Sequence, residues 1–197
     1  MELIELKQLV DLSIEDCQQI INQNPKVILS EGDFEKLLSE CISKRIGYVK
    51  EKPTPDSFAV YTQISHYKNI SNKNDARVDI LLMKPDDIVY SFDEPNKRFL
   101  YKSKESIAIE LKFLHDGDAV SKATDDFIKY EKYKGDSYYY AISLLEKSDL
   151  DETTNNRKEK IELFFDNELK KYGTPDNTNF FCHVLTKEKF DVPKEEG

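Results

Sequence analysis

The sequence predicts a single α/β domain built on a mixed sheet with helices on both faces. In some segments apolar residues recur at helical spacing, and other short segments are rich in β-branched and aromatic residues, as buried strands are. After two initial helices the expected order is three strands, a helix, a strand, a helix and a strand. Alternation of this kind after an initial meander favours a sheet covered on both sides.

Length and composition indicate one folded unit. The chain has 197 residues, of which 39% are hydrophobic and 34% charged, and no repeat or low-complexity tract marks a second domain. We therefore expect one domain over residues 1–197. Its core should span about 30–145, preceded by a helical segment at 1–29 and followed by a helix and a strand within 146–197.

Two helices are expected before the sheet. Ser13 resembles an N-terminal cap for a short helix in which Ile14, Cys17, Ile20 and Ile21 fall on one face. Ser30 begins the clearest helical pattern in the chain, which continues to about Arg45 and is ended by Gly47. Later helices are expected at 120–133 and 158–172, and the stretch 148–158 is expected to be a polar connection. The expected strands are 57–67, 76–84, 106–114, 137–145 and 179–186.

We expect the strands 76–84 and 106–114 to be central in the sheet. The segment between them has the sequence pattern of a hairpin. Two aromatic arms within residues 89–101 flank the sequence Glu94-Pro95-Asn96, which is typical of a turn. This hairpin is a candidate flap facing the substrate.

Several protein classes are excluded by simple features. Acidic residues interrupt the apolar positions of the first twenty residues, which are therefore no secretion signal, and no segment approaches the ~20 apolar residues of a membrane span. The three cysteines are Cys17, Cys41 and Cys182; they are far apart and odd in number, which indicates reduced thiols used for packing. We expect a cytoplasmic protein without a membrane partner.

The net charge of −9 argues against a general nucleic-acid coat protein, because such binding depends on Lys and Arg that neutralise phosphates. It does not exclude a nuclease, which concentrates carboxylates where a metal binds.

Charged residues inside two apolar strands are the strongest functional signal. Asp79 lies in VDILL, and Glu110 and Lys112 lie in IAIELKF. Burying an unpaired charge costs several kcal/mol, so such groups tend to be paired, metal-bound or functional. Glu110 and Lys112 project from one face, because strand side chains alternate with a period of two.

These segments resemble the PD-(D/E)xK, or restriction-endonuclease-like, nuclease superfamily, although Val78 stands where a literal PD motif has proline. The resemblance implies a three-layer α/β/α fold with a central mixed sheet. It further implies that Asp79 and Glu110 hold one or two Mg²⁺ ions, for which Mn²⁺ substitutes, and that Lys112 positions or activates the attacking water. The interval of 31 residues between Asp79 and Glu110 implies an inserted hairpin.

Many members of this superfamily place a glutamate on the helix before the sheet. Glu31 and Glu35 lie four residues apart on one helical face, and the sequence does not choose between them as a further metal ligand. On the substrate side, Arg77 and His66 are candidates for phosphate contacts. Lys129 belongs to the polar helix that commonly follows the ExK strand.

The predicted function is Mg²⁺-dependent hydrolysis of phosphodiester bonds, with DNA favoured over RNA because most relatives act on DNA. Restriction, repair, recombination and phage defence are all compatible contexts, and so is a homodimer; protein partners are not indicated. Two alternatives stay open. One is a module that keeps the fold without cleaving, and the other is an acidic protein that binds proteins, including by mimicry of nucleic acid.

Overall fold

The computed structural model describes residues 1–47, 57–66, 76–90, 99–101, 105–115, 118–119, 121–124, 138–147, 151–171 and 179–189. Its α-helices are α1 (Leu3–Gln23), α2 (Glu31–Arg45), α3 (Ser121–Thr124) and α5 (Asp151–Lys171). Short 3₁₀ helices occur at Pro25–Val27 and Pro85–Asp87. The strands are β1 (Ala59–His66), β2 (Ala76–Met83), β3 (Ile88–Tyr90), β4 (Phe99–Tyr101), β5 (Ile107–Leu114), β6 (Tyr138–Glu146) and β7 (Phe180–Lys187).

The strands form one mixed sheet in the order β3-β4-β1-β2-β5-β6-β7. Strand β2 is antiparallel to both β1 and β5, whereas β5, β6 and β7 run parallel to one another. The α/β class and the mixed sheet are therefore confirmed. The two charged segments form β2 and β5, neighbours inside the sheet, as expected from their apolar sequences.

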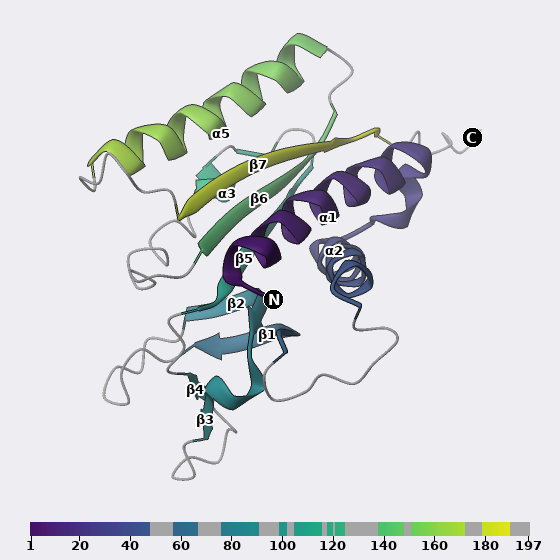
Figure 1. Ribbon diagram of the computed structural model, residues 1–197. Helices are drawn as coiled ribbons and strands as arrows, with labels where there is room; N and C mark the ends of the chain where they lie inside the picture. The colour runs from purple at the N-terminus through teal and green to yellow at the C-terminus, as the bar shows by residue number, and fades with distance from the viewer. Residues whose placement is uncertain are drawn as a thin grey trace.

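Helices cover both faces of this sheet (Figure 1). On one face α1 and α2 pack against a core that includes Ile80 of β2 and Ile109 of β5. On the other face Ile161 and Phe165 of α5 pack against a core that includes Leu81 of β2. Alternate residues of the same strands thus enter two different cores, which is why the central strands are apolar on both faces.

Helix α1 is longer than the sequence analysis predicted. It begins at Leu3, where Glu2 and Glu5 form a capping box, and the prediction of an N-terminus at Ser13 is wrong. The Ser13 side chain is buried within the helix and donates a hydrogen bond of 2.6 Å to the carbonyl of Leu9. A serine inside a helix can satisfy its hydroxyl in this way, so its presence alone does not mark a helix start.

Helix α2 begins and ends where the sequence predicts. The Ser30 hydroxyl accepts a hydrogen bond of 3.2 Å from the backbone N–H of Asp33, which caps the first turn. After the last helical residue, Arg45, Gly47 adopts a φ of 78°, in the left-handed region that glycine enters without strain.

The predicted hairpin is present as the antiparallel pair β3 and β4, while its turn at 91–98 lies outside the described residues. The pair stands at the edge of the sheet beyond β1, which leaves β2 and β5 free to pair directly. The predicted helix at 120–133 is described only as α3; residues 125–133 are not described.

The stretch 148–158, expected as a connection, is helical from Asp151 onward. The prediction failed because this first part of α5 is polar and buries few side chains, among them Thr154 and Arg157. No helix in the described ranges is long and apolar enough to cross a membrane.

Candidate functional site

Strands β2 and β5 separate at the charged residues. Among the described residues their ladder contains the pairs Leu82↔Ile107, Leu81↔Ala108 and Ile80↔Ile109. The next positions in this register are Asp79 and Glu110. From there β2 remains paired with β1, and β5 remains paired with β6. Asp79 and Glu110 therefore stand where the two central strands part.

The Asp79 side chain spans this opening. Its Oδ2 accepts a hydrogen bond of 2.8 Å from the backbone N–H of Leu111, which lies between Glu110 and Lys112. Its Oδ1 lies 3.4 Å from Nε2 of Gln63 on β1. The carboxylate is thus held against β5 beside both residues of the E-x-K pair.

Glu110 and Lys112 are positioned by the pairing of β5 with β6. Glu110 aligns with Ala141 and is only 3% exposed, whereas Lys112 aligns with Ser143 and keeps 28% of its side chain exposed. Since they are two residues apart in one strand, they share a face of the sheet. Glu110 is thus enclosed, while part of the Lys112 side chain reaches the surface.

Both candidate glutamates of α2 extend toward this region. Glu31 Oε2 accepts a hydrogen bond of 3.2 Å from the backbone N–H of Phe113, and its Oε1 lies 3.9 Å from Nζ of Lys112. Glu35 Oε2 instead accepts a hydrogen bond from Nε2 of Gln63. The sequence could not choose between the two glutamates; the structure places Glu31 against β5 and Glu35 against β1.

Gln63 is a site residue that the sequence analysis missed. Its φ of 56° is left-handed, which is rare for a residue with a side chain. It stands opposite Asp79 in the β1–β2 register, at a position the ladder skips between Thr62↔Ile80 and Ile64↔Val78. Its amide connects Glu35 with Asp79. In the sequence it looks like an ordinary polar residue of a half-buried strand, so no signal marked it.

A buried lysine fixes the segment that leads into α2. Lys187, at the end of β7, is 2% exposed and donates a hydrogen bond of 2.9 Å to the carbonyl of Ile28. Its Nζ also lies 3.6 Å from Glu146 Oε1 and 4.8 Å from the centre of the Phe113 ring. Because Ile28 is three residues before Glu31, these contacts help to position the first turn of α2.

The predicted phosphate-contacting residues are only partly described. Arg77 lies on β2 two residues before Asp79, and His66 lies on the neighbouring strand β1, where Ser65↔Arg77 and His66↔Ala76 are paired. Their side chains, and all of Lys129, lie outside what the structure describes.

The donor set suits a hard cation, although the carboxylates also contact protein groups. Asp79 and Glu110 carry carboxylate oxygens, which are the type of donor that Mg²⁺ takes, commonly one or two together with waters. Within the described residues, no group of three or more Asp, Glu, His or Cys side chains is arranged to hold a metal ion. A cation at this site would therefore have to be held by the carboxylates of Asp79 and Glu110 together with waters.

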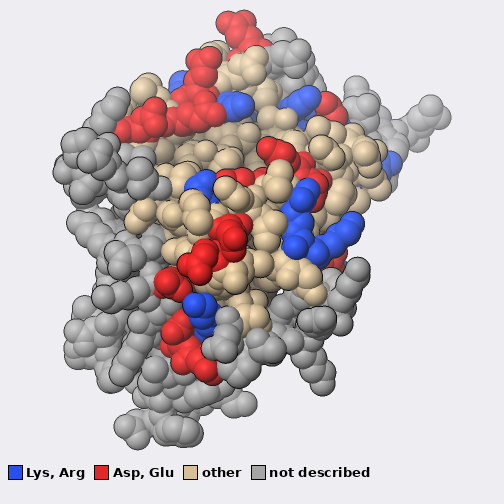
Figure 2. Space-filling view, in the orientation of Figure 1, with Lys and Arg blue, Asp and Glu red and all other residues tan. Residues whose placement is uncertain are grey.

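The surface carries charges of both signs. Figure 2 shows acidic side chains interspersed with separate groups of Lys and Arg on the visible face. Such a distribution differs from the broad basic stripe of a protein that coats nucleic acid. Comparisons with family models, curated proteins and solved structures found no match to this chain.

Proposed function

We propose that this chain is a Mg²⁺-dependent nuclease with a restriction-endonuclease-like fold, and that it hydrolyses phosphodiester bonds, preferably of DNA. The observation that carries the proposal is the hydrogen bond from Leu111 N–H to Asp79. It holds one carboxylate beside Glu110 and Lys112 at the point where two central strands separate. The mixed sheet with helices on both faces is compatible with this fold.

Each residue has a distinct role in the proposed reaction. Asp79 and Glu110 would hold Mg²⁺, which when bound polarises the phosphate and lowers the pKa of a coordinated water. Lys112, whose side chain is 28% exposed, would use its ammonium to orient the attacking water or stabilise charge on the phosphorane. Glu31, 3.9 Å from that ammonium, limits where it points. Glu31 and Glu35 remain alternative further ligands.

A second candidate is a module of the same fold that binds a partner without cleaving. Three observations favour it. No described group of three acidic, His or Cys side chains is arranged as a metal site, and the oxygens of Asp79, Glu31 and Glu35 already accept hydrogen bonds from protein groups. The net charge of −9 suits a protein partner better than a nucleic acid.

A cleavage assay separates the two candidates. The purified 197-residue protein is incubated with single- and double-stranded DNA and RNA in Mg²⁺, Mn²⁺ or EDTA, and metal binding is measured by calorimetric titration. We expect cleavage of DNA that depends on the metal and is lost in Asp79→Asn and Glu110→Gln.

Matched control substitutions exclude a contaminating nuclease. Glu159→Gln and Lys160→Met change the same residue types on the exposed face of α5 and should leave cleavage unchanged. If no substrate is cleaved and no metal binds, the nuclease proposal fails and the non-catalytic module is favoured. If cleavage persists in Asp79→Asn, the active site has been assigned wrongly.

A further inference from the structure

Strand β7 forms one edge of the sheet. It is the last strand in the order β3-β4-β1-β2-β5-β6-β7, and among the described residues only β6 pairs with it. Residues 181–184 of β7 are partly exposed, whereas the residues of β6 from Tyr139 to Leu145 are buried. Figure 1 shows β7 between α1 and α5. A strand in this position presents backbone N–H and C=O groups on its outer side.

The hydrogen bonds to β6 determine which residues of β7 have these outward groups. The carbonyls of Asn179 and Lys187 accept hydrogen bonds of 2.7 and 2.8 Å from the backbone N–H groups of Tyr139 and Lys147. The N–H and C=O of one residue in a strand point to the same side, and successive residues alternate between the two sides. The odd-numbered residues of β7 therefore face β6. The even-numbered residues between 180 and 186 direct their N–H and C=O to the edge.

Gln18 of α1 already pairs with one of these residues as a neighbouring strand would. Its Nε2 donates a hydrogen bond of 2.8 Å to the carbonyl of Thr186, and its Oε1 accepts one of 3.0 Å from the Thr186 N–H. In the described part of the chain, no hydrogen bond occupies the outward N–H and C=O of Cys182 and Val184. The sequence from Phe180 to Thr186 also lacks the proline, lysine or carboxylate that commonly protects an edge. This part of β7 can therefore pair with one more extended segment.

Helix α5 adds negative charge on one side of this edge. On one flank of the helix, Arg157 donates a hydrogen bond of 2.9 Å to the carbonyl of His115, just after β5. Glu162 and Asp166 lie on the opposite flank, toward β7, because successive helical residues are rotated by ~100°. Burial, and after it the charges of these two acids, raise the pKa of the Cys182 thiol to about 12, as expected for acids near this residue. Figure 2 shows acidic side chains along α5.

These charges favour a basic partner. Asp166 is exposed and has no ion-pair partner among the described residues. Glu162 lies 3.8 Å from Lys158 Nζ in an exposed pair, which contributes little. On the other side of the edge, Lys7 lies 2.7 Å from Asp11, so that its charge is compensated. A second copy that paired through β7 about a two-fold axis would bring the acidic flanks of both α5 helices to the same side of the joined sheet, and their repulsion opposes this pairing.

We propose that β7 binds an extended, basic segment of a partner protein as an additional strand, with backbone hydrogen bonds to Cys182 and Val184 and a basic side chain beside Asp166. The hydrogen bonds require the segment to be extended, and the basic side chain provides selectivity. The edge is two strands away from β5, which carries Glu110 and Lys112. Binding at β7 does not depend on the proposed nuclease activity, so either proposal can fail without the other.

Amide hydrogen exchange tests whether the edge is open. In the isotope-labelled 197-residue protein, NMR should show the amides of Cys182 and Val184 exchanging at least ~10-fold faster than those of His183 and Leu185, which face β6. Protection of the Cys182 and Val184 amides in the free protein would overturn the proposal. Protection that increases with protein concentration, together with dimers in analytical ultracentrifugation, would overturn it in favour of a second copy.

A fluorescent ten-residue peptide of alternating Lys and Val is the probe for binding. We expect fluorescence anisotropy to show binding at low salt, and at least ~10-fold weaker binding when Glu replaces Lys in the peptide. N-methylation of one alternate set of peptide residues should abolish binding and methylation of the other set should not, because only every second N–H of a strand faces its neighbour. Equal effects of the two sets, or no binding of the lysine peptide, would overturn the proposal.

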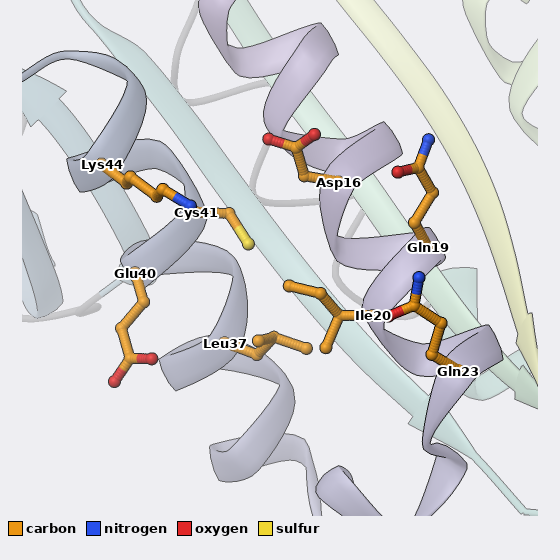
Figure 3. Close-up of a pocket in the computed structure, with 8 residues that line it drawn as sticks. All are labelled: Asp16, Gln19, Ile20, Gln23, Leu37, Glu40, Cys41 and Lys44. Carbon is orange, nitrogen blue, oxygen red and sulfur yellow. The ribbon is translucent and has the colours of Figure 1, made fainter.

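Substitutions locate the binding at β7. Val184→Pro removes an outward N–H without removing a hydrogen bond to β6, so it should abolish binding, whereas Val184→Thr should retain it. Asp166→Asn should reduce the preference for the lysine peptide. Glu40→Gln is the matched control, because Glu40 belongs to the lining of a separate hollow between α1 and α2 (Figure 3).

Each variant is first checked for cooperative melting; if Val184→Pro does not fold, the N-methylated peptides decide. Binding that persists in a folded Val184→Pro, or a preference for lysine that Asp166→Asn leaves unchanged, would overturn the proposal.

Discussion

The Asp79 carboxylate accepts a backbone hydrogen bond of 2.8 Å from Leu111, across the opening between the two central strands. In a regular antiparallel ladder a backbone carbonyl of the partner strand would occupy this position. The side chain replaces the backbone acceptor after the last paired residues, Ile80 and Ile109. The Asp79 carboxylate therefore links the two strands where their backbone pairing ends, and it also belongs to the proposed site.

This double role predicts different results for two substitutions of Asp79. Asp79→Asn keeps an oxygen acceptor of the same shape, so the free energy of unfolding should change little. Asp79→Ala leaves the Leu111 N–H without this acceptor, which should lower the free energy of unfolding by about 1–3 kcal/mol. Cleavage should be lost in both. Urea unfolding monitored by circular dichroism measures stability; equal stability of Asp79→Ala and the unmodified protein would show that the hydrogen bond contributes nothing.

Lys112 is predicted to act on the reaction and not on metal binding. Lys112→Ala should leave Mg²⁺ affinity largely intact while reducing the cleavage rate by ~10²–10³, as expected when a preorganised electrostatic contact is removed. The measurement combines single-turnover cleavage with calorimetric titration. Lys158→Ala on α5 serves as the matched control. Undiminished cleavage by Lys112→Ala would mean that its role has been misassigned.

The sequence predicted the α/β class and most of the helices and strands from features that act locally. Apolar periodicity located the two central strands, and the Ser30 cap with Gly47 located both ends of α2 because these residues satisfy backbone groups at helix termini. It misplaced the start of α1 because a serine hydroxyl can either cap a helix N-terminus or, as Ser13 does, donate to a carbonyl within the helix. It missed the first turns of α5 because a polar helix and a polar loop look alike without their tertiary contacts.

For the candidate site, the sequence identified residues but not their arrangement. Asp79, Glu110 and Lys112 stood out because charge is costly inside an apolar strand. The different positions of Glu31 and Glu35 depend on where α2 crosses the sheet, which no local pattern encodes. Gln63 was missed because its unusual φ occurs together with the skipped pair with Asp79, a feature of two paired strands that one segment does not reveal.

Gln63 is predicted to reduce the repulsion between the carboxylates of Glu35 and Asp79, because its side-chain amide faces both of them as a hydrogen-bond donor. Gln63→Glu would place a third acid between Glu35 and Asp79. In EDTA at pH 7 this variant should melt at a lower temperature than the unmodified protein. The decrease in melting temperature should become smaller as the pH falls toward 4, because the carboxylates become protonated. If a divalent cation binds here, Mg²⁺ should raise the melting temperature more for Gln63→Glu than for the unmodified chain. Gln63→Met, uncharged and of similar size, separates charge from shape. An unchanged response to Mg²⁺ would argue against a cation at this position.

Lys187 is predicted to be a stabilising residue of the segment before α2. Lys187→Met keeps an apolar chain of similar length but leaves the Ile28 carbonyl without this donor and Glu146 without this partner, which should cost about 3 kcal/mol. The double variant with Glu146→Gln should recover part of the loss. The measurement is a double-mutant cycle from urea unfolding; strictly additive effects would show that the two side chains do not interact.

His183 is predicted to make stability depend on pH. It lies on β7 with its ring stacked on Tyr140, at a centroid distance of 5.7 Å. Burial lowers the pKa of its imidazole below the ordinary value of 6.5; Lys7 acts in the same direction and Asp11 in the opposite one. Between the folded pKa and 6.5 the unfolded chain binds more protons than the folded chain, so the free energy of unfolding decreases as the pH falls. The His183 contribution is complete above about pH 6.5.

Urea unfolding between pH 7 and 5.5 tests this expectation with two variants. His183→Phe keeps a ring that can stack on Tyr140 but cannot take up a proton, so its free energy of unfolding should vary less with pH in this window. His115→Gln is the matched control, because the His115 side chain is 58% exposed, and it should retain the slope of the unmodified protein. A slope that survives in His183→Phe would place the titrating group elsewhere. If the pH dependence of stability disappears only in His115→Gln, the titrating group lies just after the end of β5.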